Sequence, residues 1–332
     1  MCRFRTMKAF TLIELIFVIV VFAIISMFGA DLYTKIYDSY IQTRAMNQLE
    51  SRTGNVLSLI SSRLEDRIRG AVIGRVQATG DFVPISLVGE THDVLEWLGQ
   101  SIESKNLVGN AATPGNSIGW SGFADLGSIA GYIPPATAAA NAGASFSFTT
   151  QGSNLGNALT VINNIKGNQN FAIIFRNVEA DPLLRDAYGF DGANANKVAI
   201  ANIPAGVNNQ INVINYQGKI NPISRALQVE YSEQYYLTHS AYAIVPTPIN
   251  GTPHPQGGKV FDLELRYNYE PWNRQTYNNN NTPRAVIARD VSLFRFKDDN
   301  GAVAMKLCMR DNGRNLDPNR VDLIVCKSQV VY

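Results

Sequence analysis

Charged side chains are scarce in this sequence, and their scarcity argues against the most charge-dependent functions. Only 17% of the 332 residues are charged, and 29 Lys and Arg against 27 Asp and Glu leave a net charge of +2. No long block of Lys or Arg follows the first residues of the chain. The composition therefore offers no basic groove, and we expect no nucleic-acid partner.

Histidine and cysteine are also few, with three of each, and they are not spaced as metal ligands. His92, His239 and His254 are scattered and none lies beside a cysteine, which argues against a zinc site. Residues 115–119 (Gly-Asn-Ser-Ile-Gly) fit the pattern G-x-S-x-G, but a nucleophile elbow needs a strand before this motif and a helix after it. Here a Gly- and Ser-rich loop surrounds the motif, so we expect no catalytic residues and a protein that is not an enzyme.

The sequence does contain one long apolar run near its start, from Phe10 to Ala30. Its 21 residues are rich in Ile, Val, Leu and Phe and include no Pro. In a helix they would reach across ~30 Å, the thickness of a bilayer core. Glu14 interrupts the run, and a carboxylate there costs about 2.5–3.5 kcal/mol on insertion scales. A plain anchor would gain by losing this carboxylate, so we expect Glu14 to have a partner.

The residues that flank the apolar run predict its orientation. Arg3, Arg5 and Lys8 precede it, so the positive-inside rule leaves them in the cytoplasm and exports the chain after Asp31. A secretory signal peptide would carry no acid in its apolar region and would end at small residues, where this chain has Phe28. A lipoprotein signal would place a cysteine after the run. A plain single-span anchor remains the alternative.

Residues 9–14, Ala-Phe-Thr-Leu-Ile-Glu, resemble the processing site of type IV pilins and of the pseudopilins of type II secretion. The resemblance implies that a prepilin peptidase cuts between Ala9 and Phe10 and that the new amine of Phe10 is N-methylated. It also implies that Glu14 meets this amine on a neighbouring subunit, since an ammonium and a carboxylate in lipid cost far less as a pair than alone. The family usually has Gly before the cut, where this chain has Ala9. Translation from Met7 would leave a three-residue leader.

The resemblance divides the chain into four parts: a leader (1–9), a transmembrane or filament-core half-helix (10–30), an amphipathic half-helix (31–69) and a periplasmic α+β head (70–332). Within the amphipathic half, Gly54 is a candidate kink, and Gly70 and Gly74 are candidate stops. The amphipathic pattern comes from apolar residues mostly three or four apart, or at multiples of that spacing: Leu32, Ile36, Tyr40, Leu49, Val56, Ile60, Leu64 and Ile68.

In the first part of the head we expect one helix and one insertion. The helix is expected around Asp93 to Lys105, capped by Thr91 or Asp93, with Trp97 and Leu98 facing inward. Residues 109–170 are rich in Gly, Ala, Ser and Asn, which predicts an insertion of long loops and small strands on the head's surface.

The rest of the head is predicted to be an antiparallel sheet packed on the helix stem. The segments around residues 238–240 are expected to pair, and Asn300-Gly301 is expected to close a hairpin, because Asn-Gly readily adopts positive φ. β-branched and aromatic residues predict strands at residues 82–88, 171–175, 197–203, 211–214, 226–231, 234–237, 241–245, 259–269, 285–296, 303–309 and 321–331.

Later segments of the head resemble the heads of larger pilin-like proteins of type II secretion. The matching segments are residues 231–237, 267–272 and 291–296. Major subunits usually have much smaller heads, so this resemblance implies a large minor pseudopilin. The aromatic residues in the second segment are candidates for a contact patch, with core packing as the alternative: Tyr267, Tyr269 and Trp272.

Two cysteines and a nearby acidic loop complete the candidate sites. Cys2 would leave with the leader, so Cys308 and Cys326 remain as an even pair in an exported domain, which predicts a disulfide. Its loop of 17 intervening residues would stabilise the fold by ~3 kcal/mol. Oxygen ligands for calcium could come from this loop, although it lacks an EF-hand pattern and a solvated turn is the favoured interpretation: Asp311, Asn315, Asp317 and Asn319.

These observations predict a structural subunit, a minor pseudopilin of a type II secretion pseudopilus, with no cofactor other than weakly indicated calcium. Its expected partners are other pilin-like subunits, the prepilin peptidase, the inner-membrane assembly platform and membrane lipid. We expect it in the bacterial inner membrane as a single-pass protein, with its leader cytoplasmic and its head periplasmic, and in the pseudopilus once assembled. The alternatives are a minor type IV pilin for adhesion or DNA uptake and, from a different class, a membrane-anchored periplasmic binding module.

Overall fold

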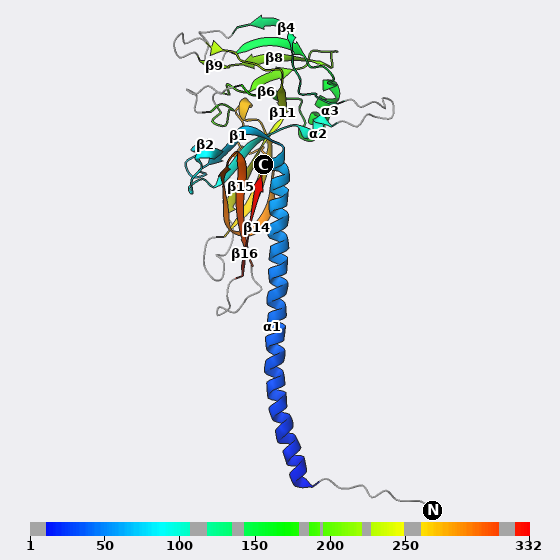
Figure 1. Cartoon of the computed structure of the whole chain (residues 1–332), viewed down its shortest axis with the longest axis vertical. Coiled ribbons are helices and arrows are strands. Elements are labelled where there is room, and N and C mark those ends of the chain that lie inside the picture. Colours follow the sequence, from blue (N-terminus) through cyan, green and yellow to red (C-terminus); the bar gives the residue numbers. More distant parts are fainter. Residues whose placement is uncertain are drawn as a thin grey trace, which may run out of the picture.

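A single long helix carries a β-rich head at its C-terminal end (Figure 1). The computed structural model describes residues 11–106, 118–134, 143–178, 186–192, 195–220, 227–248, 260–311 and 323–332. The helix, α1 (Leu12–Glu65), has 54 residues, which corresponds to about 80 Å. It runs unbroken through Gly54, so the predicted kink is absent from this described stretch.

The helix ends four residues before the predicted boundary at residue 69, and the predicted stops were wrong. The chain enters β1 (Arg67–Arg75) directly, so Gly70 and Gly74 lie in a strand. Gly70 has φ +87°, a left-handed conformation at the point where the strand register shifts. At Gly74 a Cβ would lie 2.5 Å from a methyl carbon of Val88, so close packing requires glycine. Both glycines therefore serve the strand and not a helix end.

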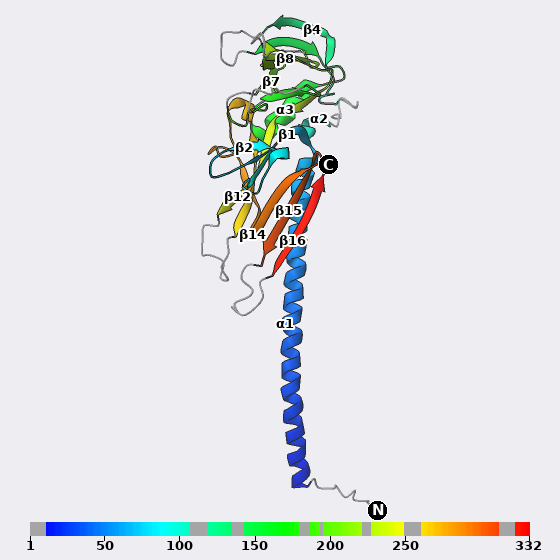
Figure 2. The ribbon, with the colours of Figure 1, turned by 60° about the vertical axis from the view of Figure 1, so that its left-hand side comes forward.

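The first of two large sheets packs against the upper part of α1, as the views in Figures 1 and 2 agree. Every neighbouring pair in it is antiparallel. In sheet order its strands are β16 (Ile324–Val331), β15 (Ala302–Arg310), β14 (Arg284–Asp299), β13 (Phe261–Tyr269), β12 (Ser240–Pro248), β3 (Val94–Gly99), β1 and β2 (Phe82–Pro84).

The second sheet forms the end of the head farthest from the N-terminus. It is also antiparallel. Its strands, in order, are β11 (Tyr235–Thr238), β6 (Phe171–Phe175), β7 (Ala199–Asn202), β8 (Gln210–Tyr216), β5 (Ala144–Thr149) and β4 (Asp125–Ile133). The remaining elements are η1 (Ile85–Leu87), α2 (Ile102–Lys105), α3 (Leu155–Lys166), η2 (Pro271–Asn273) and the short pair β9 (Lys219–Ile220) and β10 (Leu227–Gln228).

Residues 109–170 are therefore not a surface insertion of loops, as far as the structure describes them. They contribute β4, β5 and α3 to the second sheet and its core. Local signals set the ends of α3: the Asn154 side chain accepts a hydrogen bond from the backbone N–H of Asn157, and Gly167 ends the helix with φ +76°. The expected small strands are present as β4 and β5. The expected surface position was wrong, because Phe146 and Phe148 of β5 enter the core of the second sheet.

Three hydrophobic cores hold these layers together. One lies between α1 and the first sheet, one lies on the α3 side of the second sheet, and one lies between the two sheets. The five residues of β6 show how a strand serves two cores. Phe171, Ile173 and Phe175 enter the second core, whereas Ala172 and Ile174 point to the core between the sheets. Because β6 is buried on both faces, the two sheets form one head.

Two further predictions about the head were wrong. The expected helix at Asp93 to Lys105 is instead the strand β3, buried at every position, followed by the short α2. Trp97 and Leu98 are buried as predicted, but they face opposite sides of a sheet. The expected pairing around residues 238–240 does not occur, because β11 pairs with β6 in the second sheet whereas β12 pairs with β3 and β13 in the first.

The later part of the head matches its prediction more closely. β14 and β15 form the expected hairpin, with Asn300 and Gly301 both at positive φ in its turn. β16 then pairs with β15 and lies beside α1. The α+β class and an antiparallel sheet packed on the helix stem are therefore confirmed.

Candidate functional site: the apolar helix and its stem

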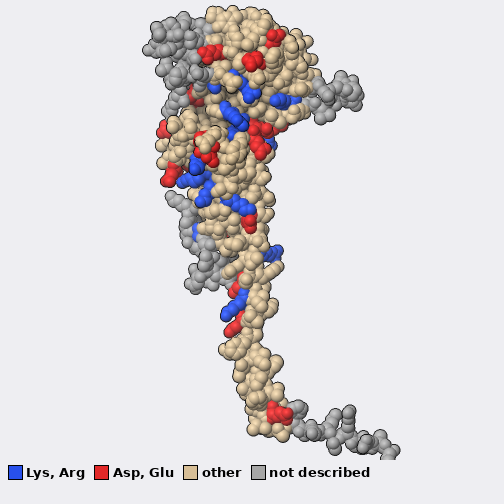
Figure 3. All heavy atoms as spheres, in the orientation of Figure 1, with Lys and Arg blue, Asp and Glu red and all other residues tan. Residues whose placement is uncertain are grey.

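The N-terminal half of α1 is exposed and apolar. From Leu12 to Tyr37 every described side chain is exposed, and α1 is long and apolar enough to cross a membrane. Between Glu14 and Asp31 it carries no charged residue, and Figure 3 shows this uncharged surface on the lower part of the helix. So large an apolar surface on one chain marks contact with lipid or with other proteins. The helix thus has the length and composition of a single-pass membrane anchor.

Exposed tyrosines follow the apolar run. Tyr33, Tyr37 and Tyr40 are each more than half exposed, and the rings of Tyr33 and Tyr37 stack with centroids 6.5 Å apart. Tyrosines of this kind are enriched where a membrane meets water, because the ring is apolar and the hydroxyl is polar. Their position is consistent with a membrane boundary just beyond Ala30.

Glu14 lies in the first turn of α1, and its backbone N–H donates to the Thr11 carbonyl at 3.1 Å. Its side chain is exposed, and no described residue of this chain forms an ion pair with it. A carboxylate near a helix N-terminus is favoured by the helix dipole, but this contributes only about 0.3–1 kcal/mol, less than the insertion cost of the charge. Ala9 and Phe10, the predicted processing residues, lie outside the described part of the chain.

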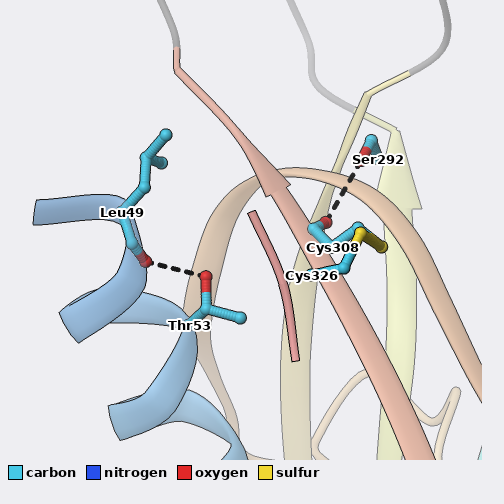
Figure 4. Close-up of a disulfide and its surroundings, with 5 residues drawn as sticks. All are labelled: Leu49, Thr53, Ser292, Cys308 and Cys326. Carbon is cyan, nitrogen blue, oxygen red and sulfur yellow. Dashed lines mark hydrogen bonds between the residues drawn. A yellow bond between two sulfur atoms is a disulfide. The ribbon is translucent and has the colours of Figure 1, made fainter. Parts of the chain in front are cut away.

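The C-terminal half of α1 is a stem buried against the first sheet. The stem residues in this core include Leu49, Leu57, Ile60 and Leu64, and they face β15 and β16. The Thr53 hydroxyl is satisfied within the helix, since it donates to the Leu49 carbonyl at 2.8 Å (Figure 4). The same rigid helix therefore carries an exposed apolar half and a half that belongs to the head.

The predicted disulfide is present in the strands beside the stem. Cys308 on β15 and Cys326 on β16 are direct cross-strand partners with Cα atoms 4.0 Å apart, and Figure 4 shows them joined near the stem. The Ser292 hydroxyl donates to the Cys308 carbonyl at 3.3 Å from the neighbouring strand β14. The bond thus cross-links β15 and β16, which both contact α1.

Two polar contacts that sequence analysis did not find also hold the stem. Lys327 on β16 reaches across Gly54 to Glu50, with Nζ and Oε1 3.2 Å apart. At the upper end of the stem, the buried Arg67 guanidinium donates to the carbonyls of Leu64 at 2.8 Å and Val331 at 3.1 Å. Arg67 therefore fastens the end of α1 to the end of β16. Neither link between α1 and β16 has a local sequence signal, because Lys327 and Glu50, and likewise Arg67 and Val331, are more than 200 residues apart.

A buried ion pair lies between the two sheets. Arg75 on β1 pairs with Glu96 on β3, and the Tyr269 hydroxyl donates to the other carboxylate oxygen of Glu96 at 3.0 Å. Burial raises the pKa of Glu96, and the Arg75 guanidinium and the Tyr269 hydrogen bond oppose that rise. The group is enclosed and joins β1, β3 and β13 of the first sheet, so it stabilises that sheet and offers no access to a substrate.

The remaining candidates do not form a site among the described residues. Tyr269 and Trp272 are buried in the core between the sheets, so the core interpretation holds for them, and Tyr267 packs against the stem core. The His239 Nδ1 lies 2.7 Å from the buried Ser101 hydroxyl, and the Gly89 backbone N–H donates to the His92 Nδ1 at 3.0 Å.

Of the calcium candidates, Asp311 directly follows β15, whereas Asn315, Asp317 and Asn319 lie outside the described residues. His254 and residues 115–117 of the G-x-S-x-G motif also lie outside them. Where the structure describes the chain, no cluster of three or more His, Cys, Asp or Glu could hold a metal ion.

No protein-family model, curated protein or solved structure matches this chain. The chemistry of α1 and the head therefore carries the functional argument.

Proposed function

We propose that this protein is a pilin-like assembling subunit, a minor pseudopilin of a type II secretion pseudopilus. One combined observation carries the proposal. The apolar half of α1 is exposed and has Glu14 near its start, and this carboxylate has no partner among the described residues. A monomeric anchor gains nothing from this carboxylate. A subunit whose neighbour supplies an ammonium group does gain, because pairing offsets the cost of both charges in lipid.

The proposed assembly uses the two halves of α1 differently. Before assembly the apolar half lies in the inner membrane, and in the filament it packs against the same half of other subunits. The stem keeps the head attached throughout, because its buried residues belong to the head's own core. In this proposal a prepilin peptidase cuts between Ala9 and Phe10, and the N-methylated Phe10 of one subunit pairs with Glu14 of the next.

The location and partners follow from that assembly. The leader is cytoplasmic, the head is periplasmic, and the partners are other pilin-like subunits, the peptidase and the inner-membrane assembly platform. The two sheets make a large head, which supports a minor subunit over a major one. The chemistry of the helix is shared by pseudopilins and pili, so a minor type IV pilin is the second member of the same class.

The test is the intact mass and N-terminal sequence of the protein from membranes with and without the prepilin peptidase. We expect a mature chain that starts at methylated Phe10 only when the peptidase is present. An unprocessed chain under both conditions would contradict the proposal and leave a simple anchored protein. Loss of exported proteins on deletion of the chain, with surface pili unchanged, would then favour secretion over a type IV pilus.

A further inference from the structure

A polar cavity lies on the side of the head, between the end of α3 and the loop that follows β13. Its volume is about 750 Å³, and seven side-chain amides line it, four of them from the consecutive residues 278–281. This volume lies within the ~300–1,000 Å³ typical of small-ligand sites. We infer that this cavity binds a neutral saccharide, a role that lies beyond the assembly proposed for α1.

Three of the seven amides of the cavity are held in place by the protein through their oxygen atoms. The oxygens of Gln275, Asn278 and Asn279 accept hydrogen bonds from the Glu270 backbone N–H (3.0 Å), the Arg266 guanidinium (2.6 Å) and the Thr276 hydroxyl (2.9 Å). No described residue accepts from their NH₂ groups. Each amide therefore has a fixed orientation and two N–H donors left for water or a ligand.

The backbone around the cavity adopts conformations that side chains rarely allow. Asn268 has φ +56° beside an irregularity in the pairing of β12 and β13, and its backbone N–H donates to the Ser240 hydroxyl at 2.9 Å. Arg274, which follows η2, has φ +61°. Irregularities of this kind re-aim side chains and concentrate at binding sites. The cavity wall is thus preorganised by the ends of β13 and η2.

The charges at the base of the cavity cancel. Lys166 pairs with Glu270, and both side chains are only 2% exposed. The Asn170 and Asn273 amides also donate to the Glu270 carboxylate. A phosphate or carboxylate ligand would therefore meet no free cation here, and the described lining holds no aromatic ring for an apolar ligand. An uncharged ligand rich in hydroxyl groups is the chemistry that fits.

The same lining favours binding over hydrolysis. Glycoside hydrolysis needs two carboxylates on either side of the scissile bond. Glu270 is the only carboxylate among the described residues that line the cavity, and it is fully engaged by Lys166 and two amides. We expect a dissociation constant on the order of 1 mM, since exposed hydrogen bonds add little net free energy and no ring stacks on the sugar.

The test uses the full chain in lauryldimethylamine oxide, a detergent without a sugar headgroup. The neutral probes are maltotriose, cellotriose and triacetylchitotriose. Their binding is measured by saturation-transfer NMR and by calorimetric titration up to 50 mM sugar. Trigalacturonate and trialanine amide are the anionic and peptide probes. Co-sedimentation with insoluble cellulose and chitin distinguishes a free sugar from a polysaccharide as the source of the ligand.

We expect at least one neutral trisaccharide to bind, and Asn279→Ala/Asn280→Ala to weaken that binding at least fivefold. Asn280→Trp, at an exposed position, should block the cavity, whereas Asn164→Ala on α3 outside the cavity should bind as the unaltered protein does. Absence of binding by all neutral sugars, equal binding by the cavity variants, or binding of the anionic or peptide probe alone would overturn the inference. None of these outcomes bears on processing at Phe10, so the proposed function is tested separately.

Discussion

Lys166, the last residue of α3, and Glu270, the residue after β13, form an ion pair that links the two sheets of the head. Both side chains are 2% exposed, and the Lys166 ammonium also donates to the His239 carbonyl at 2.9 Å. His239 is the single residue between β11 and β12, where the chain passes from one sheet to the other. The pair therefore fixes α3, the sheet crossing and the end of β13 at one point.

Removal of one partner from this pair should destabilise the head strongly. Glu270→Gln leaves an uncompensated buried ammonium, and we expect the free energy of unfolding to fall by ~3–5 kcal/mol in urea denaturation. Lys166→Met combined with Glu270→Leu should recover most of this loss, because no buried charge remains. Equal losses in the single and double variants would contradict this account.

The stability of the head should fall in mild acid because of His239. Burial lowers the pKa of this imidazole to about 4; Lys166 contributes to the decrease, and Glu103 and Glu270 oppose it. The unfolded chain, with the ordinary value near 6.5, binds the proton more readily. The contribution of His239 is therefore complete above about pH 6.5, and ~3 kcal/mol of it is lost as the pH falls to 4.

The control for this pH dependence is His239→Asn, which keeps a polar group near Ser101 but does not titrate in this range. The difference between the stability curves of the unaltered protein and of His239→Asn separates the effect of His239 from that of Asp186. Burial raises the pKa of Asp186 to about 7. Asp186 acts in the opposite direction, because its contribution is lost as the pH rises from about 4 to 7. A difference curve that stays flat between pH 6.5 and 4 would show that His239 does not set the acid limit.

The disulfide should stabilise the head and its attachment to the stem. Cys308→Ser/Cys326→Ser, and equally reduction of the unaltered protein, should lower the free energy of unfolding by ~3 kcal/mol on the loop-entropy account. The measurement is urea denaturation with and without reductant. If reductant destabilises the double variant as much as the unaltered protein, the effect does not come from this bond.

Gly54→Ala should stabilise the stem. Gly54 lies inside α1, where alanine is favoured over glycine by about 0.5–1 kcal/mol, and a Cβ would come no closer than 3.4 Å, to the mobile end of Lys327. We expect a rise of that size in the free energy of unfolding by urea denaturation. At Gly143 a Cβ would lie 2.5 Å from the Tyr216 backbone nitrogen, so Gly143→Ala should destabilise instead. A stem destabilised by Gly54→Ala would mean that Lys327 cannot move.

Glu14→Gln should separate membrane insertion from assembly. Insertion should be unchanged or improved, since the charge in the apolar run is removed. Incorporation into filaments should fall by more than about tenfold, because an ammonium on the neighbouring subunit would lose its partner. Cross-linking and shearing of filaments measure incorporation, and Asp31→Asn at the far end of the run is the matched control. Normal incorporation of Glu14→Gln would contradict the pairing.

Local sequence patterns predicted the parts of the fold that depend on local contacts. The spacing of Leu49, Val56, Ile60 and Leu64 predicted the stem, because one buried helix face repeats every three or four residues. Asn300-Gly301 predicted the hairpin, because only a few residue pairs adopt its turn. The predicted end of α1 was four residues too late, because Ile68 continues the helical spacing of apolar residues although it lies in β1.

The errors lie where distant partners decide the structure. Residues 93–105 were predicted as a helix with Trp97 and Leu98 on its inner face, whereas β3 is a strand buried on both faces. Its buried Glu96 carboxylate is satisfied by Arg75 and Tyr269, which lie 21 and 173 residues away in the sequence. Four strands of the second sheet were predicted, at residues 171–175, 197–203, 211–214 and 234–237, but their separation into a second sheet was not. That separation depends on two pairings between distant segments, β11 with β6 and β5 with β8. The amide cavity was likewise invisible, because residues 278–281 look like an ordinary polar loop until α3 is placed beside them.

The unbroken helix has a mechanical consequence. A pull along α1 would reach the head through the strands beside it, β16 and β15, and would load their ladder of hydrogen bonds in shear. Bonds loaded in shear share the force, whereas bonds pulled sideways break one after another. The Cys308–Cys326 bond limits how far the two strands can slide. The attachment of the head should therefore resist tension along α1 and should be weakest against a force that peels β16 away from the head.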